Sequence, residues 1–147
     1  MKKQILWMPL ILTAIFAAAA VSTRAQTSYG VRGNVPFDFV VGDKTIPAGR
    51  ISVQGVCGAD QGTLSITNLT VSKQALRTGR KVLGANPRGQ AKMVFHKYGN
   101  RYFLAEIWIP GYHAWELMKS KEERSLERDM RLVKNFKPER VIVSGTM

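Results

Sequence analysis

The chain has 147 residues, a formal net charge of +12 and a single cysteine, Cys57. This length suits one ordinary domain that needs no metal ion to hold its core, and the lone cysteine excludes an internal disulfide. The positive charge attracts polyanions and anionic membrane surfaces, but a basic surface that serves only solubility fits it equally well. The neighbours of Cys57 favour a buried thiol over an intermolecular bridge.

Residues 1–25 are predicted to be a secretory signal peptide. Two lysines precede an apolar run over 5–21, and the Thr-Arg-Ala sequence that ends at Ala25 suits a leader peptidase. The alternative is a retained anchor, because the run is at the lower limit of the roughly 17–25 residues that span a bilayer. Cleavage would export the protein to the periplasm or beyond, lower its net charge to +9 and leave no transmembrane segment.

Residues 26–34 are small and polar, which predicts a flexible lead-in, with at most weak strand pairing near Val31, to a single β-rich domain over 35–147. The first strand is expected over 35–41, where Phe37 and Phe39 alternate with Pro36, Asp38 and Val40. Further strands are expected at 50–56, 63–69 and 138–145, with two short ones near 73–77 and 80–83, and turns or loops at 42–44, 45–49, 57–62 and 84–90.

A β-hairpin is predicted around Gly99-Asn100, a two-residue loop with glycine at the first central position of a type II′ turn. The expected register pairs Tyr98 with Arg101 and Val94 with Ala105. The face expected to pack inward carries Met93, Phe95, Lys97, Tyr102, Leu104, Glu106 and Trp108, and the opposite face carries Val94, His96, Tyr98, Arg101, Phe103, Ala105 and Ile107.

A surface helix is predicted over about 121–133, because Ser120 and Glu123 form a capping box. Its narrow apolar stripe is expected to dock on the sheet through Leu126, Met130 and Val133. The fold class is therefore mainly β, a small antiparallel barrel or sandwich with one C-terminal surface helix and a final strand.

Few patterns in the chain indicate chemistry. Two histidines and one cysteine without metal-ligand spacing argue against a zinc site, and no G-x-S-x-G elbow exposes a serine. No glycine-rich phosphate loop is present either. The sequence therefore predicts no enzyme, no metal and no cofactor.

The hairpin offers one candidate site. His96, Tyr98 and Arg101 on one strand face could hold an anionic or sugar ligand. The alternative is that His96 only stacks on Phe103 across the strands, since the sequence shows no acid positioned to orient the imidazole.

A second candidate is an aromatic cluster. Trp108, Tyr112 and Trp115 surround His113, and sugars stack on exposed aromatic faces. The alternative is that these side chains cap an open end of a barrel beneath the helix.

Two stretches together, VPFDFVVGDKTIPAG (35–49) and MVFHKYGNRYFLAEIW (93–108), followed by KSKEER, resemble a group of small exported bacterial proteins. Members share a signal peptide, an F-x-F-x-V-G-x-x-x-x-P-A-G unit, a Y-G-x-x-Y-F hairpin and a short charged helix. The resemblance covers roughly residues 35–130 and implies export and an all-β fold. The group has no known activity, so the resemblance assigns no site residue.

We expect an exported, non-catalytic β domain that binds or scaffolds a component of the cell envelope. Its expected partners are anionic glycans or lipid head groups rather than nucleic acid. The first alternative is a lipocalin-like carrier of a small apolar ligand, and the second is a weak hydrolase that uses His96.

Overall fold

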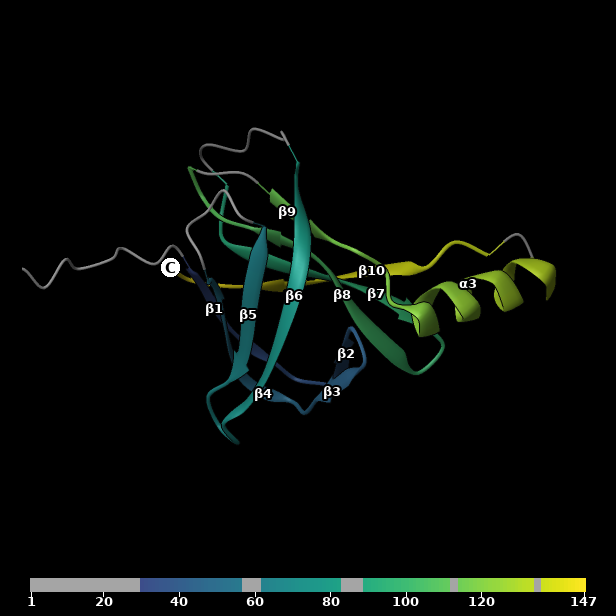
Figure 1. Ribbon diagram of the computed structural model, residues 1–147, viewed down its shortest axis with the longest axis horizontal. Coiled ribbons are helices and arrows are strands. Elements are labelled where there is room, and N and C mark those ends of the chain that lie inside the picture. The colour runs from purple at the N-terminus through teal and green to yellow at the C-terminus, as the bar shows by residue number, and fades with distance from the viewer. Residues whose placement is uncertain (1–29, 57–61, 83–88, 112–113, 134–135) are drawn as a thin grey trace, which may run out of the picture.

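The computed structural model describes residues 30–56, 62–82, 89–111, 114–133 and 136–147 (Figure 1). The predicted signal peptide, Cys57, Tyr112 and His113 lie outside the described residues. The elements are β1 Gly30–Val35, β2 Phe39–Val41, β3 Lys44–Ile46, β4 Gly49–Gly55, β5 Thr63–Asn68, β6 Lys73–Val82, β7 Lys92–Tyr98, β8 Arg101–Trp108, β9 Ala114–Leu117, α3 Lys121–Val133 and β10 Glu139–Ser144.

All ten strands belong to one sheet. Antiparallel pairing runs β1-β4-β5-β6-β9-β8-β7-β10, and β8 also pairs in parallel with β2, which carries β3. The two ends of this path meet just after β10, where Arg32 and Thr146 exchange backbone hydrogen bonds of 2.7 Å. The prediction of a mainly β fold with a C-terminal helix and a final strand is confirmed.

The core lies between the inward faces of these strands. In β5, buried Leu64 and Ile66 alternate with half-buried polar residues, which is the predicted pattern of a strand with one face on the core. Phe95 at the centre makes edge-to-face contacts with Phe37 and Phe39 at centroid distances of 5.2 and 5.1 Å. The largest fully buried side chains are Phe39, Phe95, Phe103, Ile46, Ile51, Ile66, Met93 and Ile107.

The start of the domain differs from the prediction. The expected flexible lead-in is partly a strand, because β1 pairs along its whole length with β4 and buries Val31 completely. The strand expected over 35–41 is interrupted instead. Pro36 follows the last residue of β1, where its missing N–H breaks no ladder, and β2 begins only at Phe39.

The region expected to hold two short strands forms the single ten-residue β6. Its first half pairs with β5 through Thr78, and its second half pairs with β9 from Gly79 onward. Each half therefore has its own main partner, which is why the apolar pattern changes along the strand.

The hairpin turn is confirmed, but its register shifts. Gly99 has a φ of +59° while Asn100 has none in the positive region, as a type II′ turn requires. The predicted pairs hold from Tyr98–Arg101 to Phe95–Leu104, but Val94 then lies opposite Glu106, which leaves Ala105 as a bulge. From this point the predicted faces of β8 are wrong, because Ile107 turns into the core whereas Glu106 and Trp108 turn to the face of His96, while Met93 on β7 faces the core as predicted.

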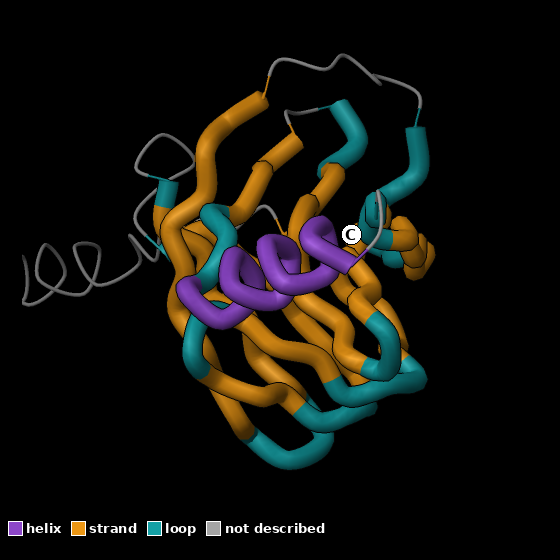
Figure 2. Tube along the Cα trace, turned by 90° about the vertical axis from the view of Figure 1, so that its right-hand side faces the viewer, coloured by secondary structure: helices purple, strands orange, loops and turns teal. Residues whose placement is uncertain are grey.

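The helix has the predicted bounds and docks on the outside of the strands (Figure 2). Leu126 and Met130 pack against a small cluster made of Val40, Tyr98 and Phe103. Val133 does not dock as predicted and is 82% exposed. Glu123, one turn before Leu126, is the buried residue of the helix instead, so the first docked side chain of the stripe is a carboxylate. No helix among the described residues is long and apolar enough to cross a bilayer.

Candidate functional site

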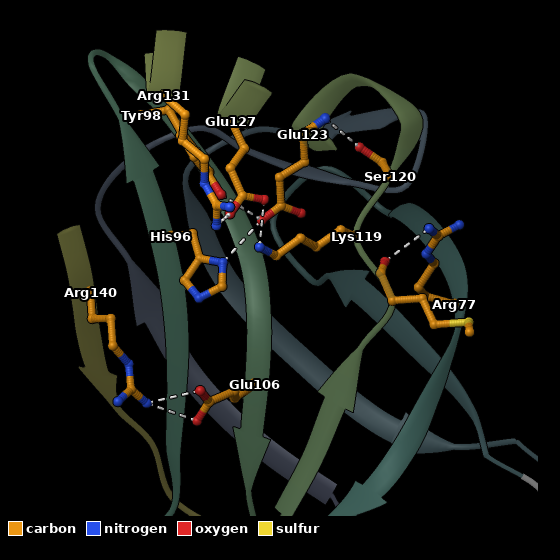
Figure 3. A network of polar contacts seen from close by, with 11 residues as sticks. Arg77, His96, Tyr98, Glu106, Lys119, Ser120, Glu123, Glu127, Arg131 and Arg140 are labelled. Atoms are coloured by element: carbon orange, nitrogen blue, oxygen red, sulfur yellow. Dashed lines mark hydrogen bonds and ion pairs between the residues drawn. The ribbon is translucent and has the colours of Figure 1, made fainter. Parts of the chain in front are cut away.

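A buried carboxylate joins α3 to the hairpin (Figure 3). Glu123 is 4% exposed, and its Oε1 lies 3.0 Å from His96 Nδ1. The hydroxyl of buried Tyr98 donates to the same oxygen at 3.4 Å. We call His96, Tyr98 and Glu123 the helix clamp, because two residues of β7 hold one residue of the helix.

The start of the helix positions this carboxylate. Ser120 Oγ accepts the backbone N–H of Glu123 at 3.0 Å, as expected for the first half of a capping box. The carboxylate of Glu123 turns away from the helix end and reaches into the sheet. The predicted cap therefore also sets the rotation of α3, with Glu123, Leu126 and Met130 facing the strands.

The clamp keeps Tyr98 protonated. Burial raises the pKa of the Tyr98 phenol well above its ordinary value of 10.0, and the nearby carboxylates of Glu123 and Glu127 raise it further. A neutral phenol can donate a hydrogen bond to a carboxylate, whereas a phenolate would repel it. The environment of Tyr98 thus favours the neutral phenol, which donates its hydrogen bond to Glu123.

A second carboxylate on α3 is held by two cations. Lys119 Nζ donates to Glu127 Oε2 at 2.7 Å, and Arg131 Nη2 donates to Oε1 at 2.6 Å. The hydrogen bond from Lys119 is the main reason that the pKa of Glu127 lies below its ordinary value, because partial burial acts in the opposite direction. Glu127 is therefore ionised, and each of its carboxylate oxygens accepts a hydrogen bond from one cation.

A small pocket opens beside the clamp. It has a volume of about 60 Å³ and is lined by His96, Ala105, Glu106, Glu116, Leu117, Lys119 and Glu123. This space can hold a few water molecules, whereas ligand pockets are usually larger than about 300 Å³. No serine, threonine or cysteine among the described residues hydrogen-bonds His96. The arrangement serves to fasten the helix.

The opposite face of α3 is basic and exposed. Lys121, Arg124 and Arg128 follow one another at helical spacing, directly opposite the docked residues. Within the described part of the chain, none of these three side chains forms an ion pair. We call Lys121, Arg124 and Arg128 the basic row.

The acids of the helix do not neutralise the basic row. Glu123 and Glu127 are engaged as described above, and Glu122 pairs with Arg101 of the hairpin. Asp129 is exposed but lies to one side of the row at helical spacing. Glu122 and Glu123 thus fasten the helix to the hairpin, while Lys121, Arg124 and Arg128 face solvent.

Some of the predicted site residues come together. His96 and Tyr98 share the clamp, but Arg101 points outward to Glu122 and covers the ring of Phe103 with its guanidinium 5.5 Å from the centroid. The sequence did not point to Glu123, which supplies the acidic partner of His96 that seemed to be missing. The sequence signal that could have indicated it is the glutamate at the third position of the helix, just before the apolar stripe.

The two described tryptophans of the predicted aromatic cluster lie on opposite faces of the sheet. Trp115 is opposite Ile107 and is 6% exposed in the core. Trp108 is on the other face, where its Nε1–H donates to Glu106 at 2.8 Å and Lys92 lies over its ring. These two rings therefore do not form one exposed surface for a sugar.

A larger pocket of about 320 Å³ lies between β6 and the β2–β3 hairpin. Arg77 on its wall donates to the carbonyl of Met118 at 2.9 Å, and Lys44 donates to the carbonyl of Gln74 at 3.3 Å. Arg77 Nε is buried without a partner. Arg77 and Lys44 thus both donate to backbone carbonyl groups, and Asp43 also lines this pocket.

No group of three or more potential metal ligands occurs within the ranges that the structure covers. Comparisons of the chain with protein-family models, curated proteins and solved structures find no match.

Proposed function

We propose that the chain is an exported, non-catalytic β domain of the cell envelope that binds anionic partners through the basic row of α3. The observation that carries this proposal is the division of charge on the helix. Its glutamates are engaged, while Lys121, Arg124 and Arg128 are exposed and form no ion pair with any residue that the structure describes. Export is supported by the signal-peptide pattern of residues 1–25.

A rigid row of cations suits an extended anionic surface. Each lysine or arginine held near such a surface contributes about 1 kcal/mol of attraction, so three of them are sufficient for salt-sensitive binding. The clamp supports this role, because it fixes the rotation of the helix and so presents the three cations together. Glycans with acidic groups and lipid head groups both offer the required charge.

The two alternatives have less support. A carrier needs an interior space, whereas the inward side chains of the described strands pack into one core. A hydrolase is favoured by the contact between His96 and Glu123, but the pocket beside it has room for water rather than for a substrate. A panel of ester and glycoside substrates would revive it if an activity appeared and then vanished in His96→Ala.

Removal of the basic row should abolish binding to a polyanion. We expect residues 26–147, which include every described residue, to elute from heparin above about 0.2 M salt. The triple variant Lys121→Gln, Arg124→Gln, Arg128→Gln should elute below this concentration, because its remaining cations are dispersed. The measurement is the salt concentration at elution from one column at pH 7.

A second triple variant provides the matched control. Arg32→Gln, Arg50→Gln, Lys73→Gln removes the same charge from exposed positions on β1, β4 and β6. It should elute close to the unmodified protein. Equal shifts of both variants, or elution of the unmodified protein below about 0.2 M salt, would mean that the charge serves only solubility.

A further inference from the structure

We infer that the anionic partner is a phospholipid bilayer, which α3 meets with its basic row and with Leu132 of its last turn. This inference rests on the proposed function and names the class of partner. It is carried by the exposure of Leu132, which is 82% exposed at the end of the helix.

The position of Leu132 connects it to the cations. It follows Arg128 by four residues and Lys121 by eleven, so it continues the basic row along the same face of the helix. At a rise of about 1.5 Å per residue, the row and Leu132 together span roughly 16 Å. A flat surface can therefore touch all four side chains at once.

The end of the helix is accessible to such a surface. Leu126 and Met130 fix the earlier turns against Val40, Tyr98 and Phe103. The last turn extends past the tip of the hairpin and away from the body of the sheet (Figure 1). Leu132 thus lies at a projecting end of the helix, where no described residue covers it.

Leu132 distinguishes lipid from glycan. An acidic polysaccharide would pair with the cations but would leave Leu132 in water. At the surface of an anionic bilayer, phosphate groups can pair with the basic row while the side chain of Leu132 enters the boundary between head groups and acyl chains. Apolar burial and charge attraction then act on the same face of α3.

The experiment uses residues 26–147, since the apolar run over 5–21 would itself bind lipid. Binding is measured by co-sedimentation with vesicles of phosphatidylcholine alone and with vesicles that contain about one-third phosphatidylglycerol. We expect binding to the anionic vesicles only. Leu132→Ser should weaken it by about tenfold without changing elution from heparin, and loss of the basic row should weaken it by about a hundredfold.

The control variant Leu69→Ser, Val71→Ser removes two exposed apolar side chains between β5 and β6, and it should bind anionic vesicles like the unmodified protein. A Leu132→Trp variant adds a direct readout, because entry of the indole into the bilayer shifts its emission to shorter wavelength.

Three results would overturn the inference. Retention on heparin without binding to anionic vesicles would reject the bilayer and leave the proposed function standing. Vesicle binding that is unchanged by Leu132→Ser, with no emission shift in Leu132→Trp, would reject contact through the last turn. Failure to bind both heparin and vesicles would reject the proposed function together with the inference.

Discussion

Replacement of Phe95 by alanine should lower the free energy of unfolding by about 3–5 kcal/mol, the usual cost of deleting a fully buried aromatic ring. Phe95 is 0% exposed and contacts Phe37 and Phe39 edge to face. Two terms make up this loss of stability. The smaller side chain gains less free energy from leaving water, and the neighbouring strands cannot move to fill the cavity left by the ring. Urea unfolding of residues 26–147, followed by circular dichroism, measures it.

Leu76→Ala is the matched control, because it also shortens a large apolar side chain but at a position 60% exposed. It should change the unfolding free energy by no more than about 0.5 kcal/mol. Similar losses for Phe95→Ala and Leu76→Ala would show that the described core is not the one that stabilises the domain.

Glu123→Ala should destabilise the protein by about 2–4 kcal/mol and should release α3 before the strands unfold. The substitution leaves His96 Nδ1 and the Tyr98 hydroxyl without their shared acceptor, and each buried polar group without a partner costs about 1–3 kcal/mol. Hydrogen exchange measured by mass spectrometry should show faster exchange over 121–133 than over β7 and β8.

Glu122→Ala provides the comparison for this helix. The neighbouring glutamate is exposed and pairs with Arg101, and pairs of this kind contribute about 0–1 kcal/mol. Its exchange over α3 should remain close to that of the unmodified protein. If Glu122→Ala and Glu123→Ala have equal effects, the clamp is not what holds the helix.

Local sequence patterns predicted the elements that depend on neighbours along the chain. Gly99-Asn100 specifies its turn because glycine takes the positive φ at the first position, and Ser120 caps the helix through its own first turn. Alternation of Leu64 and Ile66 with polar residues likewise identified β5. Each of these signals is complete within a few residues.

Features that depend on distant partners were not predictable in the same way. The bulge at Ala105 changes which side chains of β8 meet the core, yet nothing in the local alternation marks it. β1 was expected only as weak pairing near Val31, because its stability comes from pairing with β4 and from burial of Val31, not from its small polar residues.

The candidate site shows the same limit. His96 was recognised as a candidate, but its partner Glu123 is 27 residues away and belongs to a helix that was predicted to dock through apolar side chains only. The division of charge on α3 also depends on which of its glutamates pair with residues of other elements. Arg101 engages Glu122 and His96 engages Glu123, and both contacts are tertiary.

The most direct test of the account maps the residues that an anionic ligand touches. A short heparin fragment is titrated into ¹⁵N-labelled residues 26–147, and amide chemical-shift changes are followed by NMR. The account predicts that the largest changes occur at Lys121, Arg124, Arg128 and their neighbours on α3. Changes confined to the pocket of Lys44 and Arg77, with α3 unaffected, would contradict it.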